Sequence, residues 1–117
     1  MARYTKSSPP LEGKIPPQNI EAEQSVLGAL LLDKEAIIKV ADIIQTRDFY
    51  QKSHQIIYDA IVHLFQAQEP IDLINISNRL KSLNALEEIG GMGYLTTLVN
   101  AVSTPAHIVS HAKIVHH

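Results

Sequence analysis

Apolar residues recur along this chain at the spacing of an α-helix, which gathers residues three and four positions apart on one face. The clearest stretch has Ile37, Val40, Ala41 and Ile44 at positions i, i+3, i+4 and i+7. We find no convincing alternation of apolar and polar residues, which would indicate strands, and no Asn-Gly hairpin signal. The sequence therefore predicts an all-α fold, a compact bundle of about six helices with short connections.

Capping residues, prolines and glycines separate the predicted helices. Asn19 is expected to cap the first helix and Asp72 the fourth. Pro70 follows the third helix, the glycines at 90–93 form a loop, and Pro105 suits the first position of the sixth helix. Beyond the stretch already named, the residues expected to face the core are Ile20, Val26, Leu27, Leu30, Leu31, Ile57, Ile61, Leu64, Phe65, Leu73, Ile76, Leu80, Leu83, Leu95, Leu98, Val99, Val102, Ile108, Ala112 and Val115.

Gly28 interrupts the first predicted helix. A glycine inside a helix costs about 1 kcal/mol relative to alanine. We interpret the residue as a point where another helix packs closely against the first one.

The length and composition fit one domain behind a terminal tail. The chain has 117 residues, of which 45% are hydrophobic, enough for a core at this length. Residues 1–17 are rich in proline and serine and are predicted to be a flexible tail, while residues 18–115 form the helical domain. The last two residues, 116–117, are interpreted as a remnant of a histidine tag. The longest apolar run, residues 29–32, is far too short to span a membrane. The lack of cysteine fits the cytoplasmic location that we expect.

The charge pattern argues against strong nucleic-acid binding by this chain alone. Its formal net charge is −2, and its 10 lysines and arginines are scattered without forming a basic run. Phe49, Tyr58 and Phe65 are expected in the core rather than as exposed rings for base stacking, and Tyr94 is expected to be partly exposed. The absence of cysteine excludes disulfide scaffolds, zinc fingers and thiol catalysis.

Groups that could carry catalysis have simpler structural explanations. The glycines at 90–93 are not followed by the Gly-Lys-Ser/Thr of a phosphate-binding loop. Carboxylate pairs such as Glu21 and Glu23 are expected to cap helices or face solvent. We therefore predict no catalytic residue and no cofactor in this chain.

Histidines are the only other candidate ligands. His107 and His111 share a helical face, but a metal site needs further ligands, which the terminal His116 and His117 could supply. His54 and His63 lie on opposite sides of their helix and are expected at the surface or in caps. The sequence thus predicts no metal site.

Five segments resemble the amino-terminal domain of the DnaB-type replicative helicases, and their order and spacing also fit that family. They are PPQNIEAEQSVLGALLLD at 16–33, DFYQKSHQIIYDAI at 48–61, PIDLINISNRL at 70–80, GGMGYLTTL at 90–98 and STPAHIVSHAKIV at 103–115. The first segment is the most specific of the five, and together they span most of the chain.

The resemblance implies a role within a ring-shaped hexamer that unwinds DNA. In that family the amino-terminal domains form a collar, arranged as a trimer of dimers, which docks the helicase-binding domain of primase. A helicase loader is a further candidate partner. The ATP and Mg²⁺ used by the parent protein bind in a carboxy-terminal RecA-like domain, which this sequence lacks.

We therefore predict a non-catalytic interaction domain that forms a dimer in isolation and docks partners. The interface candidates are Met92, Tyr94, Leu95 and Leu98, because methionine and tyrosine beside a loop supply adaptable contact area. The alternative is that all four residues belong to the core.

Two other functions remain open at this point. One is the helicase-binding domain of primase, whose fold the resemblance implies to be similar, although the segment at 16–33 argues against it. The other is an autonomous helical module that binds nucleic acid, for which salt-dependent binding to single-stranded DNA would be the discriminating observation.

Overall fold

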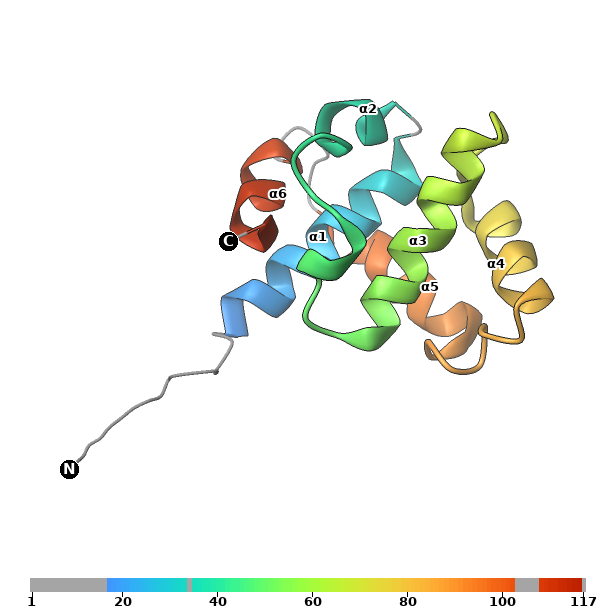
Figure 1. Ribbon diagram of the computed structural model, residues 1–117. Helices are drawn as coiled ribbons and strands as arrows, with labels where there is room; N and C mark the ends of the chain where they lie inside the picture. The colour runs from blue at the N-terminus through green and yellow to red at the C-terminus, as the bar shows by residue number, and fades with distance from the viewer. Residues whose placement is uncertain (1–16, 34, 103–107, 117) are drawn as a thin grey trace.

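The computed structural model describes residues 17–33, 35–102 and 108–116. These ranges contain six α-helices, one short 3-10 helix and no strand, which confirms the predicted all-α bundle (Figure 1). The elements are α1 Pro17–Leu32, α2 Ala36–Val40, η1 Thr46–Asp48, α3 Lys52–Gln66, α4 Leu73–Ser82, α5 Gly91–Asn100 and α6 Ile108–His116.

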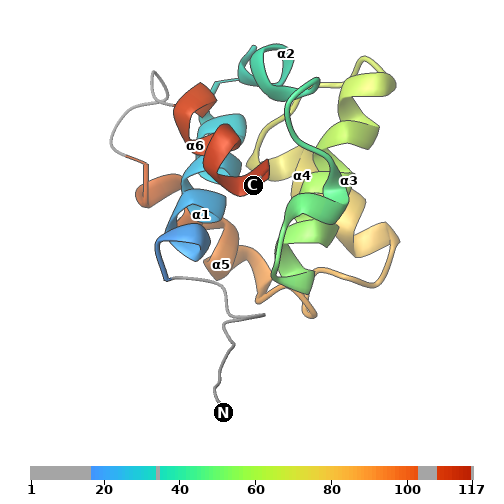
Figure 2. The same cartoon turned by 60° about the vertical axis from the view of Figure 1, so that its left-hand side comes forward.

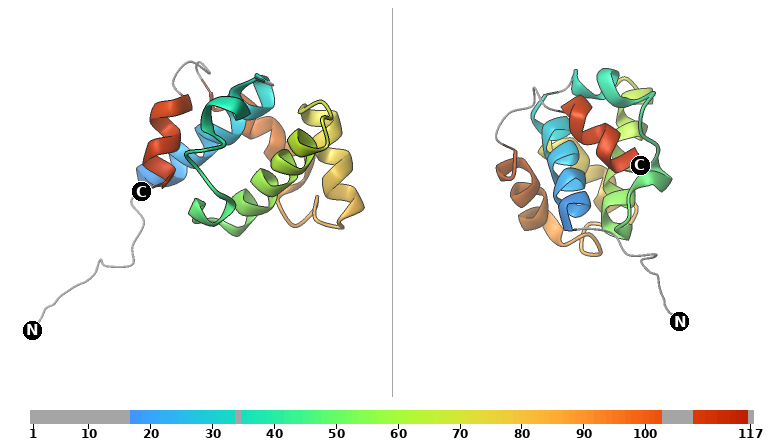
Figure 3. Two further views of the ribbon diagram at one scale, coloured as in Figure 1. Left: turned by 45° about the horizontal axis from the view of Figure 1, so that its top comes forward. Right: turned by 90° about the vertical axis from the view of Figure 1, so that its left-hand side faces the viewer.

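Helix α1 lies at the centre of the bundle. Its most extensive contacts are with α6 and α5, between which it passes, and α3 and α2 also pack against it (Figure 2 and Figure 3). Val26, Leu27, Ala29 and Leu30 are almost completely inaccessible to solvent. A helix that is apolar on several sides is stable only when it is covered on several sides, so this sequence becomes the central helix.

Helix α5 packs directly against Gly28 of α1. A Cβ atom added here would lie less than 3.0 Å from both the Leu98 carbonyl oxygen and the Val102 Cγ2 atom. Atoms of this kind do not approach each other so closely, so only glycine fits this position. The predicted close helix–helix contact is confirmed.

Most residues predicted to face the core do so, with exceptions near the ends of helices. Phe65 is 39% exposed and Leu83 is 48% exposed, because both lie at the carboxy end of a helix, where fewer neighbouring elements cover the stripe. Ala41, which follows α2 directly, is also exposed.

Helix α1 begins at Pro17, so Asn19 lies within the first turn instead of at the predicted cap. Pro105 lies outside the described residues.

The predicted domain boundaries remain predictions. Residues 1–16 and His117 lie outside the described ranges. Pro17, placed at the end of the tail by the sequence, begins α1, and His116 is the last residue of α6. The His116 Nδ1 atom lies 3.0 Å from an oxygen of Asp48.

Asp72 caps α4 as predicted. Its Oδ1 atom accepts a 2.8 Å hydrogen bond from the backbone N–H of Asn75, which would otherwise lack a partner in the first turn. We expect Asp72→Ala to lower the free energy of unfolding by about 1 kcal/mol in urea titrations. The control is Asp59→Ala on the exposed side of α3, which should stay within about 0.5 kcal/mol of the wild type. Equal losses in the two variants would contradict the capping role.

Candidate interaction surface

A buried hydrogen-bond network joins α1, α3 and α5. Glu23 on α1 is 2% exposed and His54 on α3 is completely buried. The His54 Nδ1 atom lies 2.7 Å from Glu23 Oε1, and its Nε2 atom lies 2.5 Å from the hydroxyl oxygen of Tyr94 on α5. The backbone N–H of Tyr50 donates to Glu23 Oε2 at 2.7 Å, and the Gln24 side-chain amide donates to the Tyr94 hydroxyl at 3.5 Å.

One arrangement of protons that satisfies this network has an ionised Glu23 and a neutral His54. In that arrangement the carboxylate only accepts hydrogen bonds, and Nδ1 of His54 donates to Glu23. In a neutral imidazole, Nε2 then accepts from the Tyr94 hydroxyl, whose oxygen in turn accepts from Gln24. The network therefore holds the phenol of Tyr94 against α3 and connects the start of α5 to the core.

The sequence-based expectations for Glu23 and His54 were wrong, since neither residue caps a helix or faces solvent. The overlooked signal is their register. Glu23 precedes the buried Val26 by three positions, and His54 precedes the buried Ile57 by three positions. Each polar residue therefore extends the apolar stripe of its helix, which places it inside the bundle. His63, by contrast, is exposed as expected.

The four candidate interface residues occupy different environments. Leu95 and Leu98 have no accessible surface, because this face of α5 packs against the rest of the bundle. In this fold they are core residues. Tyr94 is half-buried with its hydroxyl turned towards His54, and Met92 is 41% exposed. Only Met92 and part of Tyr94 remain at the surface, and their contact with a partner stays a prediction.

Large apolar side chains remain exposed on several helices. Such residues are ordinary when scattered singly, whereas a concentration of them marks an interaction site. The exposed set within the described residues comprises Leu32, Ile38, Tyr50, Phe65, Ile74, Leu83, Met92 and Ile114. The question is therefore which of these side chains border a recess that could receive a partner.

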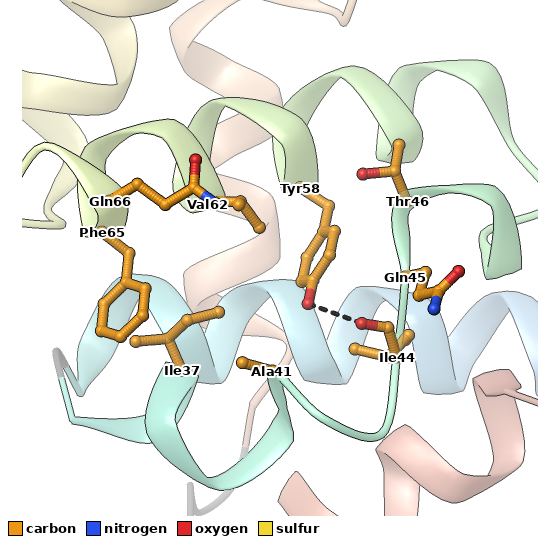
Figure 4. A pocket seen from close by; sticks show the side chains of 9 residues that line it. All are labelled: Ile37, Ala41, Ile44, Gln45, Thr46, Tyr58, Val62, Phe65 and Gln66. Carbon is orange, nitrogen blue, oxygen red and sulfur yellow. Dashed lines mark hydrogen bonds between the residues drawn. The ribbon is translucent and has the colours of Figure 1, made fainter.

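Phe65 borders a hollow of about 300 Å³ between α2 and α3. Figure 4 shows Phe65 at one end of it, Gln45 and Thr46 at the other, and Tyr58 between them. The Tyr58 hydroxyl donates a 2.9 Å hydrogen bond to the Ile44 carbonyl, which ties α3 to the segment that follows α2. The remaining lining residues are Ile37, Ala41, Ile44, Val62 and Gln66. The hollow is thus mainly apolar with an uncharged polar rim.

Burial, and to a lesser extent the negative charge of Asp48, raises the pKa of Tyr58 to about 12 from its ordinary value of 10.0. Because the pKa of Tyr58 is higher in the folded state, its protonated hydroxyl contributes to stability fully below pH 10. That contribution is lost as the pH rises through about 12. We expect the unfolding free energies of wild type and Tyr58→Phe to converge over this pH range, because phenylalanine cannot ionise. Parallel curves in urea titrations would contradict the assignment.

The described residues contain no group of three or more histidine, aspartate or glutamate side chains that could hold a metal ion. His107 and His117, two of the four histidines considered as ligands, lie outside the described ranges. Likewise, within residues 17–33, 35–102 and 108–116, no helix combines the length and the apolar character needed to cross a membrane.

Comparison with protein families and known sequences gives a consistent result. The model of the DnaB-like helicase N-terminal domain matches residues 15–117. The chain is 46% identical over 105 residues to the replicative DNA helicase DnaC of Bacillus subtilis, covering 90% of this chain and 23% of that protein. It is 44% identical over 102 residues to the replicative DNA helicase DnaB of Geobacillus stearothermophilus, covering 87% of this chain and 22% of that protein. The chain therefore spans less than a quarter of these relatives.

Solved structures agree with this result. The crystal structure of the N-terminal domain of DnaB helicase from Mycobacterium tuberculosis superposes with a TM-score of 0.83 at 43% sequence identity, covering 87% of this chain and 74% of that one. A DnaB-like replicative helicase, described together with its interactions with primase, superposes with a TM-score of 0.74 at 29% identity, covering 82% of this chain and 22% of that one. The resemblance predicted from the sequence is confirmed: the chain belongs to the family of DnaB-like helicase N-terminal domains.

Proposed function

We propose that this domain is the non-catalytic collar of a bacterial replicative DNA helicase, in which it mediates self-association and docks primase during DNA replication. The observation that carries the proposal is the match of nearly the whole chain, in sequence and in fold, to the amino-terminal domains of such helicases. One structural neighbour is a helicase described with its interactions with primase, which supports primase as the partner of this chain as well.

The distribution of apolar surface fits a docking role. The buried apolar residues form one cluster, and the exposed set does not belong to it. Half of the surface of Leu32 and more than a third of the surface of Phe65 are nevertheless exposed to water. Burying such side chains against a partner contributes roughly 25 cal/mol per Å² of apolar area removed from water.

The remaining parts of the proposal concern the whole helicase. The parent protein, in the cytoplasm of a bacterium, hydrolyses ATP with Mg²⁺ and unwinds DNA, whereas this domain supplies contacts between subunits and with primase or a loader. Turnover of ATP by the isolated chain, above the level of a contaminant, would contradict this division of labour.

Self-association can be tested at Met92. We expect sedimentation equilibrium to show a reversible dimer of the wild-type chain, and Met92→Glu to raise its dissociation constant by roughly tenfold or more, because a charge would be buried in an apolar contact. Circular dichroism should show unchanged helicity, since Met92 is exposed. The control is Ile74→Glu on α4, which is more exposed and should leave the dimer intact. Equal dissociation constants for wild type and Met92→Glu would remove Met92 from the interface.

A further inference from the structure

The hollow between α2 and α3 is the first of three hollows that are linked by shared lining residues. It shares Phe65 with a second hollow of about 390 Å³, which lies beside the carboxy end of α3. The second hollow shares Pro70 and Ile71 with a third, of about 460 Å³, which reaches Leu32 at the end of α1. We call these three neighbouring hollows together the Phe65 groove; their lining residues include Tyr58, Phe65 and Leu32.

The floor of the Phe65 groove is apolar. Ile37 and Ile71 are buried at 1% and 6% exposure, so they form a fixed base. Phe65 and Leu32 stand on this base at 39% and 50% exposure. An aromatic ring and a leucine that border a recess give a partner apolar side chains to pack against, which an isolated exposed residue does not.

The rim of the groove is acidic where the second and third hollows lie. Asp33, Glu35, Glu69 and Asp72 line them, and no lysine or arginine lines any of the three hollows among the residues that the structure describes. Asp33 and Asp72 accept backbone N–H hydrogen bonds within their own turns. Glu35 and Glu69 are both exposed to solvent. Lys34 lies outside the described ranges.

We propose that the Phe65 groove binds an amphipathic helix of another protein, with an apolar stripe that packs on Phe65 and Leu32 and with lysines or arginines that pair with Glu35 and Glu69. This inference rests on the proposed function, since it supplies the surface and the partner chemistry for docking. Apolar grooves bind helices through residues spaced three and four apart, and complementary charge at the rim sets orientation and specificity.

The charge of the groove argues against two other occupants. A nucleic acid would bring phosphates against Glu35 and Glu69. A second copy of this chain docked through the same surface would bring a second acidic rim into the contact and supply no cationic partner from it. Like charges across an interface oppose association. A cationic helix is therefore the occupant that the apolar floor and the acidic rim favour together.

The first experiment maps binding with a defined probe. The probe is a synthetic helix of about 18 residues, five turns, with a leucine stripe flanked by lysines. It is titrated into the ¹⁵N-labelled full chain. We expect saturable amide shifts centred on Ile37, Val62, Phe65 and Ile71. A matched peptide with glutamates in place of the lysines should bind at least tenfold more weakly. Shifts centred on another surface, or equal binding of the two peptides, would overturn the proposal.

The second experiment separates the groove from general charge attraction. The double variant Glu35→Lys/Glu69→Lys should weaken binding of the lysine peptide by roughly tenfold or more. Glu87→Lys/Glu88→Lys changes the net charge equally at exposed positions between α4 and α5 and should weaken it by about threefold at most. Phe65→Ser should weaken binding further, whereas Ile74→Ser, also at an exposed apolar position, should not. Equal losses in both charge variants would overturn the proposal.

The third experiment distinguishes failure of the groove from failure of the proposed function, with the helicase-binding domain of primase as the ligand. We expect Glu35→Lys/Glu69→Lys to weaken its binding while Glu87→Lys/Glu88→Lys does not. Equal binding of this domain to wild type and Glu35→Lys/Glu69→Lys would exclude the Phe65 groove as its docking site and leave the proposed function intact. No binding to the wild type would contradict the proposed function, and the peptide titration would still decide whether the groove accepts a cationic helix.

Discussion

Replacement of His54 by leucine is expected to lower the free energy of unfolding by about 3–5 kcal/mol, because it leaves the Glu23 carboxylate buried without its side-chain partner. Leucine roughly matches the volume of the ring, so the loss reports mainly on the missing hydrogen bonds and not on a cavity. The Tyr94 hydroxyl loses its bond to Nε2 in the same variant. Urea titration monitored by circular dichroism measures the change.

The double variant Glu23→Leu/His54→Leu completes the test. Removal of both partners leaves no unpaired charge, so this chain should be more stable than His54→Leu alone. The backbone N–H of Tyr50 loses its acceptor in the double variant, which keeps the recovery incomplete. The single variant Glu23→Leu supplies the other half of the comparison. If the losses of stability in Glu23→Leu and His54→Leu simply add in the double variant, the two side chains are not coupled and our description of the network is wrong.

Gly28→Ala is expected to destabilise the fold by about 1–3 kcal/mol or more, because the added methyl group would meet the backbone carbonyl of Leu98. A flexible side chain could move away from the methyl group, whereas a carbonyl within α5 can move only with its helix. Thermal and urea unfolding measure the loss, and the contact between α1 and α5 should loosen with it.

Gly93→Ala is the matched control for this substitution. Gly93 lies in α5, and a methyl group there would meet nothing within 4 Å. This variant should gain roughly 0.5–1 kcal/mol, because alanine favours the helix over glycine. A neutral or stabilising effect of Gly28→Ala would contradict the close approach of the two helices.

The helical pattern of the sequence was sufficient to predict the fold class and several local features. The apolar spacing gives the number of helices, Asp72 caps α4, and Gly28 marks the close contact. Helical spacing and the Asp72 cap depend on residues that are close in sequence, and the contact at Gly28 depends only on that residue having no side chain. The same local reasoning failed for Glu23 and His54, because a buried polar group is stable only with partners that come from other helices.

The interaction surface was less accessible to sequence reasoning. Leu95 and Leu98 were considered both as core and as interface residues, and only the packing of α5 shows that their side chains are buried. The Phe65 groove escaped prediction altogether, because it is assembled from segments that are distant in sequence. Phe65 itself was predicted to be buried, since its stripe gives no indication that α3 ends one residue later.

The most direct test of the proposed function is isothermal titration calorimetry of the wild-type chain with the helicase-binding domain of primase from the same organism. We predict saturable binding with a negative heat-capacity change, which is the mark of apolar burial. The absence of binding at protein concentrations of about 100 µM, roughly ten times a dissociation constant of about 10 µM, would contradict the docking role of this domain.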